Sequence, residues 1–231
     1  MIIHLPLQCN IFDQLILEET LHKNNQDNFF ITNFDSEQAI VLGRYCQHDE
    51  WISSENNIDL VRRYSGGGVV VVDPNTLFLS LLVDIRSIGI KPYPKDILEW
   101  SMITCFRNNN IGIELMENDW VINNKKVGGN ALAIHKNRVA IHMCFLWDYN
   151  PTLMKSLKQP PRSPDYRNSR PHASFLTTLN DKLCSPTDFF EMVVRNIQPQ
   201  KQLKTNQALK EVSTYNNMTY RTNRMNKMLA I

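Results

Sequence analysis

The sequence predicts an α/β (α+β) protein in which helices flank a β-sheet, and two observations support this fold class. Short runs of β-branched and apolar residues alternate with turn signals across residues 60–83 and 113–147, a pattern typical of strands. Segments 10–23, 94–107 and 186–197 each combine a helix-start signal with an apolar face. A chain of 231 residues is long enough to bury a sizeable core in one domain.

The first quarter of the chain is expected to begin with a helix. Asn10 can cap this helix, Asp13 lies in its first turn, and the apolar face extends to about Lys23. Short apolar runs then predict strands at 29–32 and 39–43, and a short helix is expected at 50–57.

Three strands are expected around a run of glycines. Residues 60–63, 69–72 and 77–83 are apolar segments separated by a Ser-Gly-Gly-Gly run and by an Asp-Pro-Asn turn. The predicted order is therefore strand, glycine loop, strand, turn, strand.

The second half of the chain is expected to return to a helix and then to strands. Pro94 suits the first position of a helix that ends near Arg107, with Ile103 on its apolar face. Prolines and arginines in residues 158–173 exclude a regular element, so a long basic loop is expected there. Strands are predicted at 113–115, 120–122, 131–134 and 139–147, the last two as a hairpin.

Composition and charge narrow the classes of function. No apolar run approaches the roughly 20 residues of a transmembrane helix, and no signal peptide is visible, so we expect no membrane association and a cytoplasmic location. Five cysteines without a Cys-x-x-Cys pair argue against a disulfide framework and a structural zinc site. The net charge of +2 is too small to indicate a nucleic-acid partner.

The positive charge is concentrated near the C-terminus. Residues 201–231 hold six basic residues and one glutamate, a local charge of +5, which leaves residues 1–200 slightly acidic at −3. This tail is expected either to be solvated and partly disordered or to contact an acidic protein.

Glycine is concentrated in two segments that carry the main functional signal. Five of the eight glycines lie in the run at 66–68 and in the pair at 128–129. A glycine run lets a ligand lie against bare backbone N–H groups, and the adjacent Arg62 and Arg63 add positive charge, so the expected ligand is an anion such as phosphate. The run lacks the Gly-Lys-Ser/Thr of a P-loop. A tight hairpin without a ligand is the alternative.

Lys126 is the second candidate. It follows an Asn123-Asn124 turn and precedes two glycines, so its ammonium can project over a flat surface. Its neighbour Lys125 could do the same, and the spacing does not distinguish them. A solvated Lys-Lys pair is the alternative.

Together these segments resemble a known family. Arg-Arg-x-Ser-Gly-Gly-Gly-x-Val-x-x-Asp at 62–73, Asn-Asp-x-Val at 118–121 and Lys-x-x-Gly-x-Ala at 126–131 are similar to the lipoate–protein ligase A family of the biotin/lipoate ligase superfamily, in a short form without the C-terminal accessory domain. The resemblance implies a mixed, largely antiparallel sheet flanked by helices, as in the catalytic domains of biotin ligases and class II aminoacyl-tRNA synthetases. Residues 1–185 would form this catalytic domain, and residues 186–231 a C-terminal helix and basic tail.

The resemblance also implies an activity. Members of the family activate lipoate with ATP to lipoyl-AMP and transfer the lipoyl group to a lysine of a carrier domain. The expected acceptors are lipoyl domains of 2-oxoacid dehydrogenase E2 subunits or the glycine cleavage H protein, and ATP, Mg²⁺ and lipoate are the expected ligands. Because some relatives without an accessory domain need another protein for adenylation, a separate activating partner is also expected.

The resemblance assigns roles to individual residues. Lys126 is the expected catalytic residue, a fixed cation that reaches both the acyl carbonyl and the phosphate. Asp119 could bind Mg²⁺ or adenosine, with a simple turn carboxylate as the alternative, and His142 matches a family histidine but could be a core residue. The other residues expected to contact ATP or the substrate are Arg63, Gly66, Gly67, Gly68, Val69, Val70, Val71 and Asn118.

Other functions remain open at this point. Cys144 could be the nucleophile of a lipoyl or octanoyl transferase that uses a preformed activated donor, although a buried structural cysteine is the alternative. The chain could also be a catalytically silent protein that binds lipoate or a carrier domain. Biotin fits less well, because biotin ligases do not characteristically carry the Arg-Arg-x-Ser-Gly-Gly-Gly form.

Overall fold

An eight-stranded mixed sheet forms the centre of the protein, in a computed structural model that describes residues 1–231 except 54–57, 160–162, 206, 208–217 and 226–231. Its first strand in the chain, β1, is parallel to both neighbours, and the other pairs are antiparallel. The expected mixed, largely antiparallel sheet is therefore confirmed. From edge to edge its strands are β11 (Lys201–Gln202), β1 (Ile2–Pro6), β2 (Asn28–Asn33), β6 (Thr76–Asp84), β10 (Arg138–Leu146), β9 (Lys125–His135), β8 (Asp119–Ile122) and β7 (Glu114–Met116).

A second, four-stranded sheet contains the strands on either side of the glycine run. Its order is β12 (Asn223–Met225), β4 (Asp59–Arg62), β3 (Ala39–Leu42) and β5 (Val69–Val72). Strands β4 and β5 both pair with β3 and not with each other, whereas β6 belongs to the large sheet. The glycine run therefore crosses over β3, which excludes the tight-hairpin interpretation.

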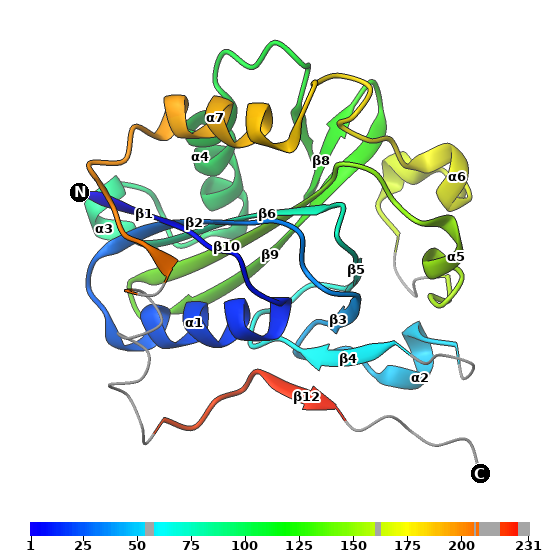
Figure 1. Ribbon diagram of the computed structural model, residues 1–231, viewed down its shortest axis with the longest axis horizontal. Coiled ribbons are helices and arrows are strands. Elements are labelled where there is room, and N and C mark those ends of the chain that lie inside the picture. The colour runs from blue at the N-terminus through cyan, green and yellow to red at the C-terminus, as the bar shows by residue number, and fades with distance from the viewer. Residues whose placement is uncertain (54–57, 160–162, 206, 208–217, 226–231) are drawn as a thin grey trace.

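Helices lie on both sides of the large sheet (Figure 1). Helices α4 (Pro94–Phe106) and α7 (Pro186–Ile197) pack against each other on one face, and α1 (Ile11–Asn24) lies on the other face, beside the small sheet. The shorter helices are α2 (His48–Trp51), α3 (Ile85–Ile88), α5 (Pro151–Met154), the 3-10 turn η1 (Asp165–Arg167) and α6 (His172–Phe175). No helix in the described ranges is long and apolar enough to cross a bilayer.

The three long helices start where their capping signals predict. The Asn10 side chain accepts a hydrogen bond from the Asp13 N–H at the start of α1, and Pro94 begins α4. Helix α7 opens with a reciprocal capping box between Ser185 and Asp188. All three helices agree with the predicted ranges to within one residue.

Two apolar layers hold the elements together. An aromatic cluster between the large sheet and α4 and α7 stacks Phe106, Trp120, Phe145 and Phe189 with ring centroids 4.9–6.2 Å apart. On the other face, apolar side chains of α1 pack with both sheets around Phe78. The functional segments lie on this second side, between the large sheet and the small one.

Several elements differ from the sequence expectations. The short helix expected at 50–57 runs from His48 to Trp51, and positions 54–57 lie outside the described residues. Ile103 is 63% exposed, so it is wrong as part of the apolar face of α4. The described residues of the region predicted as a basic loop are irregular, apart from the short turns of η1 and α6, and positions 160–162 lie outside the described residues.

The largest difference concerns the strand predicted at 131–134. Strand β9 begins at Lys125, so Lys126 and both following glycines lie within the sheet rather than in a turn. The turn itself is formed by Asn123 and Asn124, whose φ angles of 50° and 59° suit a two-residue hairpin connection. Pairing with β8 on one side and β10 on the other outweighs the local turn preference of glycine.

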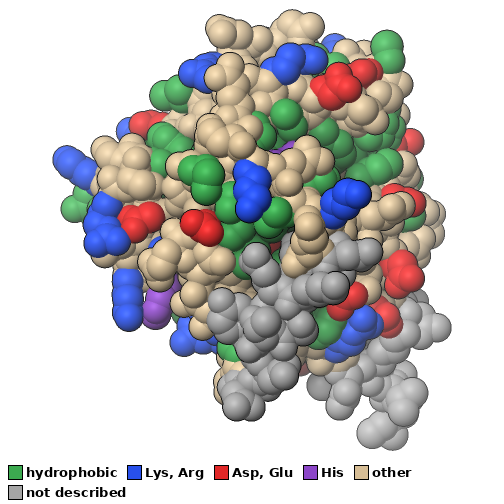
Figure 2. Space-filling model, turned by 60° about the vertical axis from the view of Figure 1, so that its left-hand side comes forward, with side chains coloured by type: hydrophobic (Ala, Val, Ile, Leu, Met, Phe, Trp, Pro, Cys, Tyr) green, Lys and Arg blue, Asp and Glu red, His purple; other side chains and the backbone are tan. Residues whose placement is uncertain are grey.

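Two short segments of the basic tail are built into the sheets. Strand β11 pairs with β1, and β12 pairs with β4, although positions 206, 208–217 and 226–231 lie outside the described residues. The side chains of both strands are mostly exposed, so these segments are ordered and solvated. On the face drawn in Figure 2, acidic and basic side chains are interspersed among hydrophobic ones.

Candidate functional site

Lys126 is the inward-facing member of the lysine pair. Its Nζ lies 2.8 Å from Oδ1 of Asp119 on the neighbouring strand β8, while Lys125 is exposed. The side chain runs over Gly129, where a Cβ atom would stand only 3.3 Å from the ammonium nitrogen. A half-buried ammonium is thus fixed by a carboxylate and by bare backbone, which suits it to meet negative charge on a ligand.

Asp119 also binds a residue from the basic loop. Its Oδ2 accepts a hydrogen bond of 2.9 Å from the Tyr166 hydroxyl, so its two oxygens hold different partners. Burial, together with the negative charge of Asp119, raises the pKa of Tyr166, which keeps this phenol protonated as a donor. The resulting chain of contacts is Tyr166, Asp119, Lys126.

Residues 164–177 are attached to the start of β9 around Phe175. Tyr166 packs against the Phe175 ring, and the guanidinium groups of Arg167 and Arg170 lie 4.9 and 5.3 Å from its centroid. The Thr177 N–H donates to the Lys126 carbonyl over 2.8 Å. The basic loop is therefore positioned by contacts to the same residues that hold the ammonium.

Arg63 shapes the glycine loop from inside. Its guanidinium donates to the carbonyl oxygen of Gly66 over 2.8 and 3.1 Å and to that of Gly68 over 2.9 Å. Burial lowers its pKa to about 10, so it stays charged near pH 7. The sequence predicted a nucleotide contact for Arg63, whereas the contacts seen in the protein are mostly with the loop itself.

The glycine loop lies close to both sheets because its glycines and Gly43 have no Cβ atom that would clash. A Cβ atom on Gly43 would stand 1.9 Å from the Gly67 carbonyl oxygen, and Gly67 itself has a φ of 88°. The Gly66 N–H donates to the Leu132 carbonyl of β9 over 3.1 Å, and Gly67 approaches Asn130 on the same strand. Strand β9 therefore brings the two glycine segments together.

The glycines of β9 have different roles. A Cβ atom on Gly128 would stand 2.5 Å from the Cys144 carbonyl oxygen and 2.8 Å from the Phe145 ring, so Gly128 is needed for packing on β10. Gly129 instead leaves space for the Lys126 side chain.

The predicted valines do not share one environment. Val69 and Val71 pack in the cluster of Ile40 on the outer side of the small sheet, as the period of two along a strand requires. Val70 faces the opposite way and packs in the apolar cluster that includes Cys144. Asn118 is exposed, and its carbonyl accepts from the Asn130 side chain over 3.1 Å.

His142 contacts α1 rather than Lys126. Its Nδ1 lies 2.7 Å from Glu18 Oε2, and Tyr64 packs edge-on against its ring at 5.2 Å. Both Glu18 and His142 are shielded from solvent. These contacts place His142 in a buried polar cluster beside the sheet.

Cys144 is a poor nucleophile in this environment. Burial raises the pKa of its thiol, and the positive charges of Lys126 and Arg63 offset this effect only in part. Its Sγ is 3.8 Å from the Gly129 carbonyl oxygen. The thiol form that burial favours does not attack acyl groups readily.

The residues around Asp119 do not form a magnesium site of their own. Both carboxylate oxygens already contact Lys126 and Tyr166. Within the part of the chain that the structure describes, no three His, Cys, Asp or Glu side chains converge. Mg²⁺ prefers several oxygen ligands in an octahedron, so Asp119 alone does not fit as a resident metal site.

The sequence matches one family of catalytic domains over most of its length. The lipoyl protein ligase A/B catalytic domain matches residues 10–198, and the chain belongs to that family. A similar protein is the inactive lipoate–protein ligase 2 of Plasmodium falciparum (isolate 3D7), 27% identical over 82% of this chain and 67% of the relative. The chain spans between 42% and 67% of the length of the curated relatives it matches.

Solved structures agree on the fold. The bipartite lipoate protein ligase of Thermoplasma acidophilum, studied with its E2 lipoyl domain, has a TM-score of 0.71 at 17% identity, covering 91% of this chain and 89% of that one. A lipoate–protein ligase A bound with ATP has a TM-score of 0.69, also at 17% identity, covering 91% and 92%. The fold expected from the resemblance to lipoate–protein ligases is confirmed.

Sequence reasoning missed some residues that build the site. Tyr166 carried no predicted role, and its contact with Asp119 spans 47 positions, which no local pattern can indicate. Gly43 was taken as the end of a strand, yet it permits the closest approach to the glycine loop. A glycine directly after an apolar run was the available signal.

Proposed function

We propose that the protein is a lipoate–protein ligase that makes lipoyl-AMP from lipoate and ATP and transfers the lipoyl group to a lysine of a carrier domain. The observation that carries the proposal is the position of Lys126, paired with Asp119 and placed on the strand that also supports the glycine loop. Membership of the family supports the same reaction class.

The first step joins two anions. A carboxylate oxygen of lipoate attacks the α-phosphorus of ATP, the bond to the bridging oxygen breaks, and pyrophosphate leaves. The Lys126 ammonium would lower the repulsion between the carboxylate and the phosphate. Arg63 would contribute indirectly, because it holds the loop in shape.

The second step moves the acyl group. The neutral amine of the acceptor lysine attacks the acyl carbonyl carbon, and the bond between that carbon and the phosphate oxygen breaks. The attacking nitrogen loses a proton to solvent as the amide forms, and AMP leaves with the negative charge. Lys126 can stabilise both the carbonyl oxygen and the departing phosphate, while Asp119 and Tyr166 keep its ammonium in place. Mg²⁺ enters this proposal only as a counterion of the ATP phosphates.

The acceptor is expected to be a lipoyl domain of an E2 subunit or the glycine cleavage H protein. The Thermoplasma ligase, which was studied with its E2 lipoyl domain, supports the first of these classes. A cytoplasmic location and a division of the chain near residue 185 stay predictions. A requirement for a separate activating protein is the alternative to adenylation by this chain itself.

Two alternatives follow from specific observations. An acyltransferase that uses a thioester is disfavoured by the raised pKa of Cys144, but a transferase supplied with a ready-made adenylate would need only the second step. A silent binding protein is suggested by the relative in Plasmodium falciparum that is named inactive. The ion pair between Lys126 and Asp119 favours a catalytic protein over a binding protein without activity.

One assay separates these functions. The purified protein is incubated with lipoate, ATP and an unmodified lipoyl domain, and the mass of the domain is measured. A mass increase with ATP supports the ligase. An increase only with synthetic lipoyl-AMP identifies a transferase that depends on an activating partner, and no increase with either donor supports a silent binding protein.

A further inference from the structure

A cavity of about 360 Å³ lies at the opposite end of β9 from Lys126. It is bounded by the end of α1, the loop after β3, the glycine loop, β9 and the segment before β12. Because a strand rises about 3.3 Å per residue, the lining residue Leu132 is about 20 Å along β9 from Lys126. Lys126 therefore lies well away from this cavity, which shares Gly66 with the glycine loop.

The side chains around this cavity are unusually positive. Among the described residues that line it, Lys23, Arg44 and Arg221 are cationic and none is acidic. Lys23 is paired with Glu19, whereas no described carboxylate forms an ion pair with either arginine. Two guanidinium groups without a carboxylate partner thus border one hollow.

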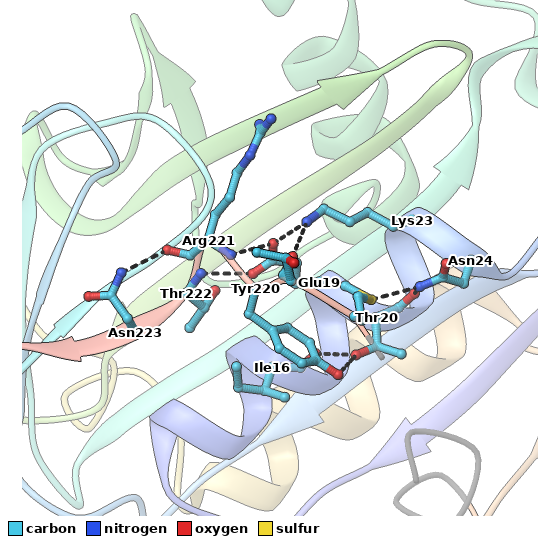
Figure 3. A network of polar contacts seen from close by, with 11 residues as sticks. Ile16, Glu19, Thr20, Lys23, Asn24, Tyr220, Arg221, Thr222 and Asn223 are labelled. Atoms are coloured by element: carbon cyan, nitrogen blue, oxygen red, sulfur yellow. Dashed lines mark hydrogen bonds and ion pairs between the residues drawn. The ribbon is translucent and has the colours of Figure 1, made fainter. Parts of the chain in front are cut away.

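Arg221 is held by its backbone. The buried carboxylate of Glu19 accepts the N–H groups of Arg221 and Thr222, each over 2.9 Å. Figure 3 shows these bonds, and the Arg221 side chain extends away from them with its guanidinium free of the network drawn. The backbone is therefore fixed while the charged group remains available.

Arg44 is held in a comparable way. Its N–H donates to the Ser65 carbonyl over 2.9 Å, and the Arg62 guanidinium donates to the carbonyls of Gly43, Arg44 and Cys46 over 2.8–3.2 Å. Its own guanidinium lies 5.0 Å from the Tyr45 ring centroid. Both arginines consequently project from backbones that hydrogen bonds to other side chains fix in place.

The positive region continues into a neighbouring hollow of about 150 Å³. This hollow shares His22 and Lys23 with the cavity and adds Lys136, while its acidic residue, Asp84, is paired with Arg86. Burial lowers the pKa of His22 to about 4, so the permanent cations carry the charge near pH 7.

We propose that this cavity binds a small phosphate-bearing anion between Arg44 and Arg221, at a site distinct from Lys126. Guanidinium groups match phosphate oxygens in paired hydrogen bonds, and two of them suit a multiply charged phosphate. The volume lies in the lower part of the range of small-molecule sites. Leu132, Ala133 and Ile134 add an apolar wall, which fits an organic phosphate.

Calorimetric titration with inorganic tripolyphosphate tests the proposal in the Lys126→Ala variant, where the catalytic lysine cannot contribute. Binding is expected to persist there and to weaken about tenfold or more with Arg44→Gln or with Arg221→Gln added. Arg195→Gln, an exposed arginine on α7 paired with Glu191, is the matched control and should bind unchanged.

Three results would overturn the second site. The first is loss of all binding in Lys126→Ala alone. The second is that the Arg44→Gln and Arg221→Gln variants bind as tightly as the control. The third is that Arg195→Gln weakens binding as much as the substitutions of Arg44 and Arg221 do. Circular dichroism of each variant verifies the fold. Because Arg44 and Arg221 come from different segments, a folding defect in one variant leaves the other as a test.

Discussion

The hydroxyl of Tyr166 and the carboxylate of Asp119 are joined by a hydrogen bond of 2.9 Å between the basic loop and strand β8. The other oxygen of the same carboxylate lies 2.8 Å from the Lys126 ammonium. A residue far from Lys126 in the sequence therefore helps to set the position of the proposed catalytic cation.

Removal of this hydroxyl should lower activity without unfolding the protein. Tyr166→Phe is expected to reduce kcat/KM for lipoyl transfer about tenfold, because a hydrogen bond to a charged group is worth roughly 1.5–3 kcal/mol. Steady-state kinetics measure the effect. Tyr93→Phe, at a 61% exposed tyrosine, is the matched control, and equal rates in both variants would refute the positioning role.

The two lysines of the pair should behave differently. Lys126→Ala is expected to reduce the rate of lipoyl transfer about 100-fold or more, since loss of a charge-stabilising group typically costs that much. Lys125→Ala should keep the wild-type rate, because its side chain is exposed. Comparable losses in both variants would contradict the assignment.

Cys144 should be dispensable for an adenylate mechanism. Its thiol is partly buried and has a raised pKa, so Cys144→Ala is expected to retain ATP-dependent modification of the lipoyl domain at close to the wild-type rate. Mass spectrometry of the domain measures this. Abolished transfer in a folded variant would instead support a thioester intermediate.

Gly128 should be required for stability. A methyl group there would clash with the Cys144 carbonyl at 2.5 Å, so Gly128→Ala is expected to lower the free energy of unfolding by about 2 kcal/mol or more. Urea denaturation measures the change. Gly66→Ala is the control, because its nearest neighbouring atom would be 3.8 Å away, and a similar loss there would argue against the clash.

Glu19 should give the fold a specific acid sensitivity. Hydrogen bonds from Lys23 and from the N–H groups of Arg221 and Thr222 outweigh desolvation and lower the pKa of Glu19. A pKa that is lower in the folded protein stabilises the fold at pH values above the pKa of the unfolded chain, which is about 4.3. This stabilisation is lost as the pH falls through the pKa of Glu19 in the folded protein. Glu19→Gln is expected to cost about 1–3 kcal/mol of unfolding free energy near pH 7.

The pH dependence distinguishes this effect from a general one. The difference between wild type and Glu19→Gln should shrink as pH falls below 4, because the wild-type carboxyl then becomes neutral as well. Glu191→Gln, at an exposed glutamate, should have little effect at any pH. A constant difference for Glu19→Gln from pH 7 to pH 3 would contradict the role of charge.

Local signals predicted the long helices well and the sheets less well. Asn10, Pro94 and the Ser185–Asp188 box act within a few residues, so their effects can be read from neighbouring positions. Pairing in the sheets depends on distant partners. The turn preference of Gly128 and Gly129 therefore misled the prediction, because β8 and β10 hold them in an extended conformation.

In the candidate site, too, local motifs were predictable and contacts between elements were not. Resemblance picked Lys126 and Asp119, which the fold pairs, but it could not indicate that Arg63 bonds the loop carbonyls or that His142 pairs with Glu18 on α1. These contacts cross between elements. They depend on tertiary packing that no spacing in the sequence encodes.

The pairing of β12 with β4 has a consequence for how the protein folds during synthesis. Asn223 pairs with Arg62, so the two strands are about 160 residues apart in the chain. While the intervening residues are being made, the outer edge of β4 has unpaired N–H and C=O groups, which can recruit strands from other chains. Ribosome-bound intermediates that lack β12 are therefore the species most in need of chaperone protection.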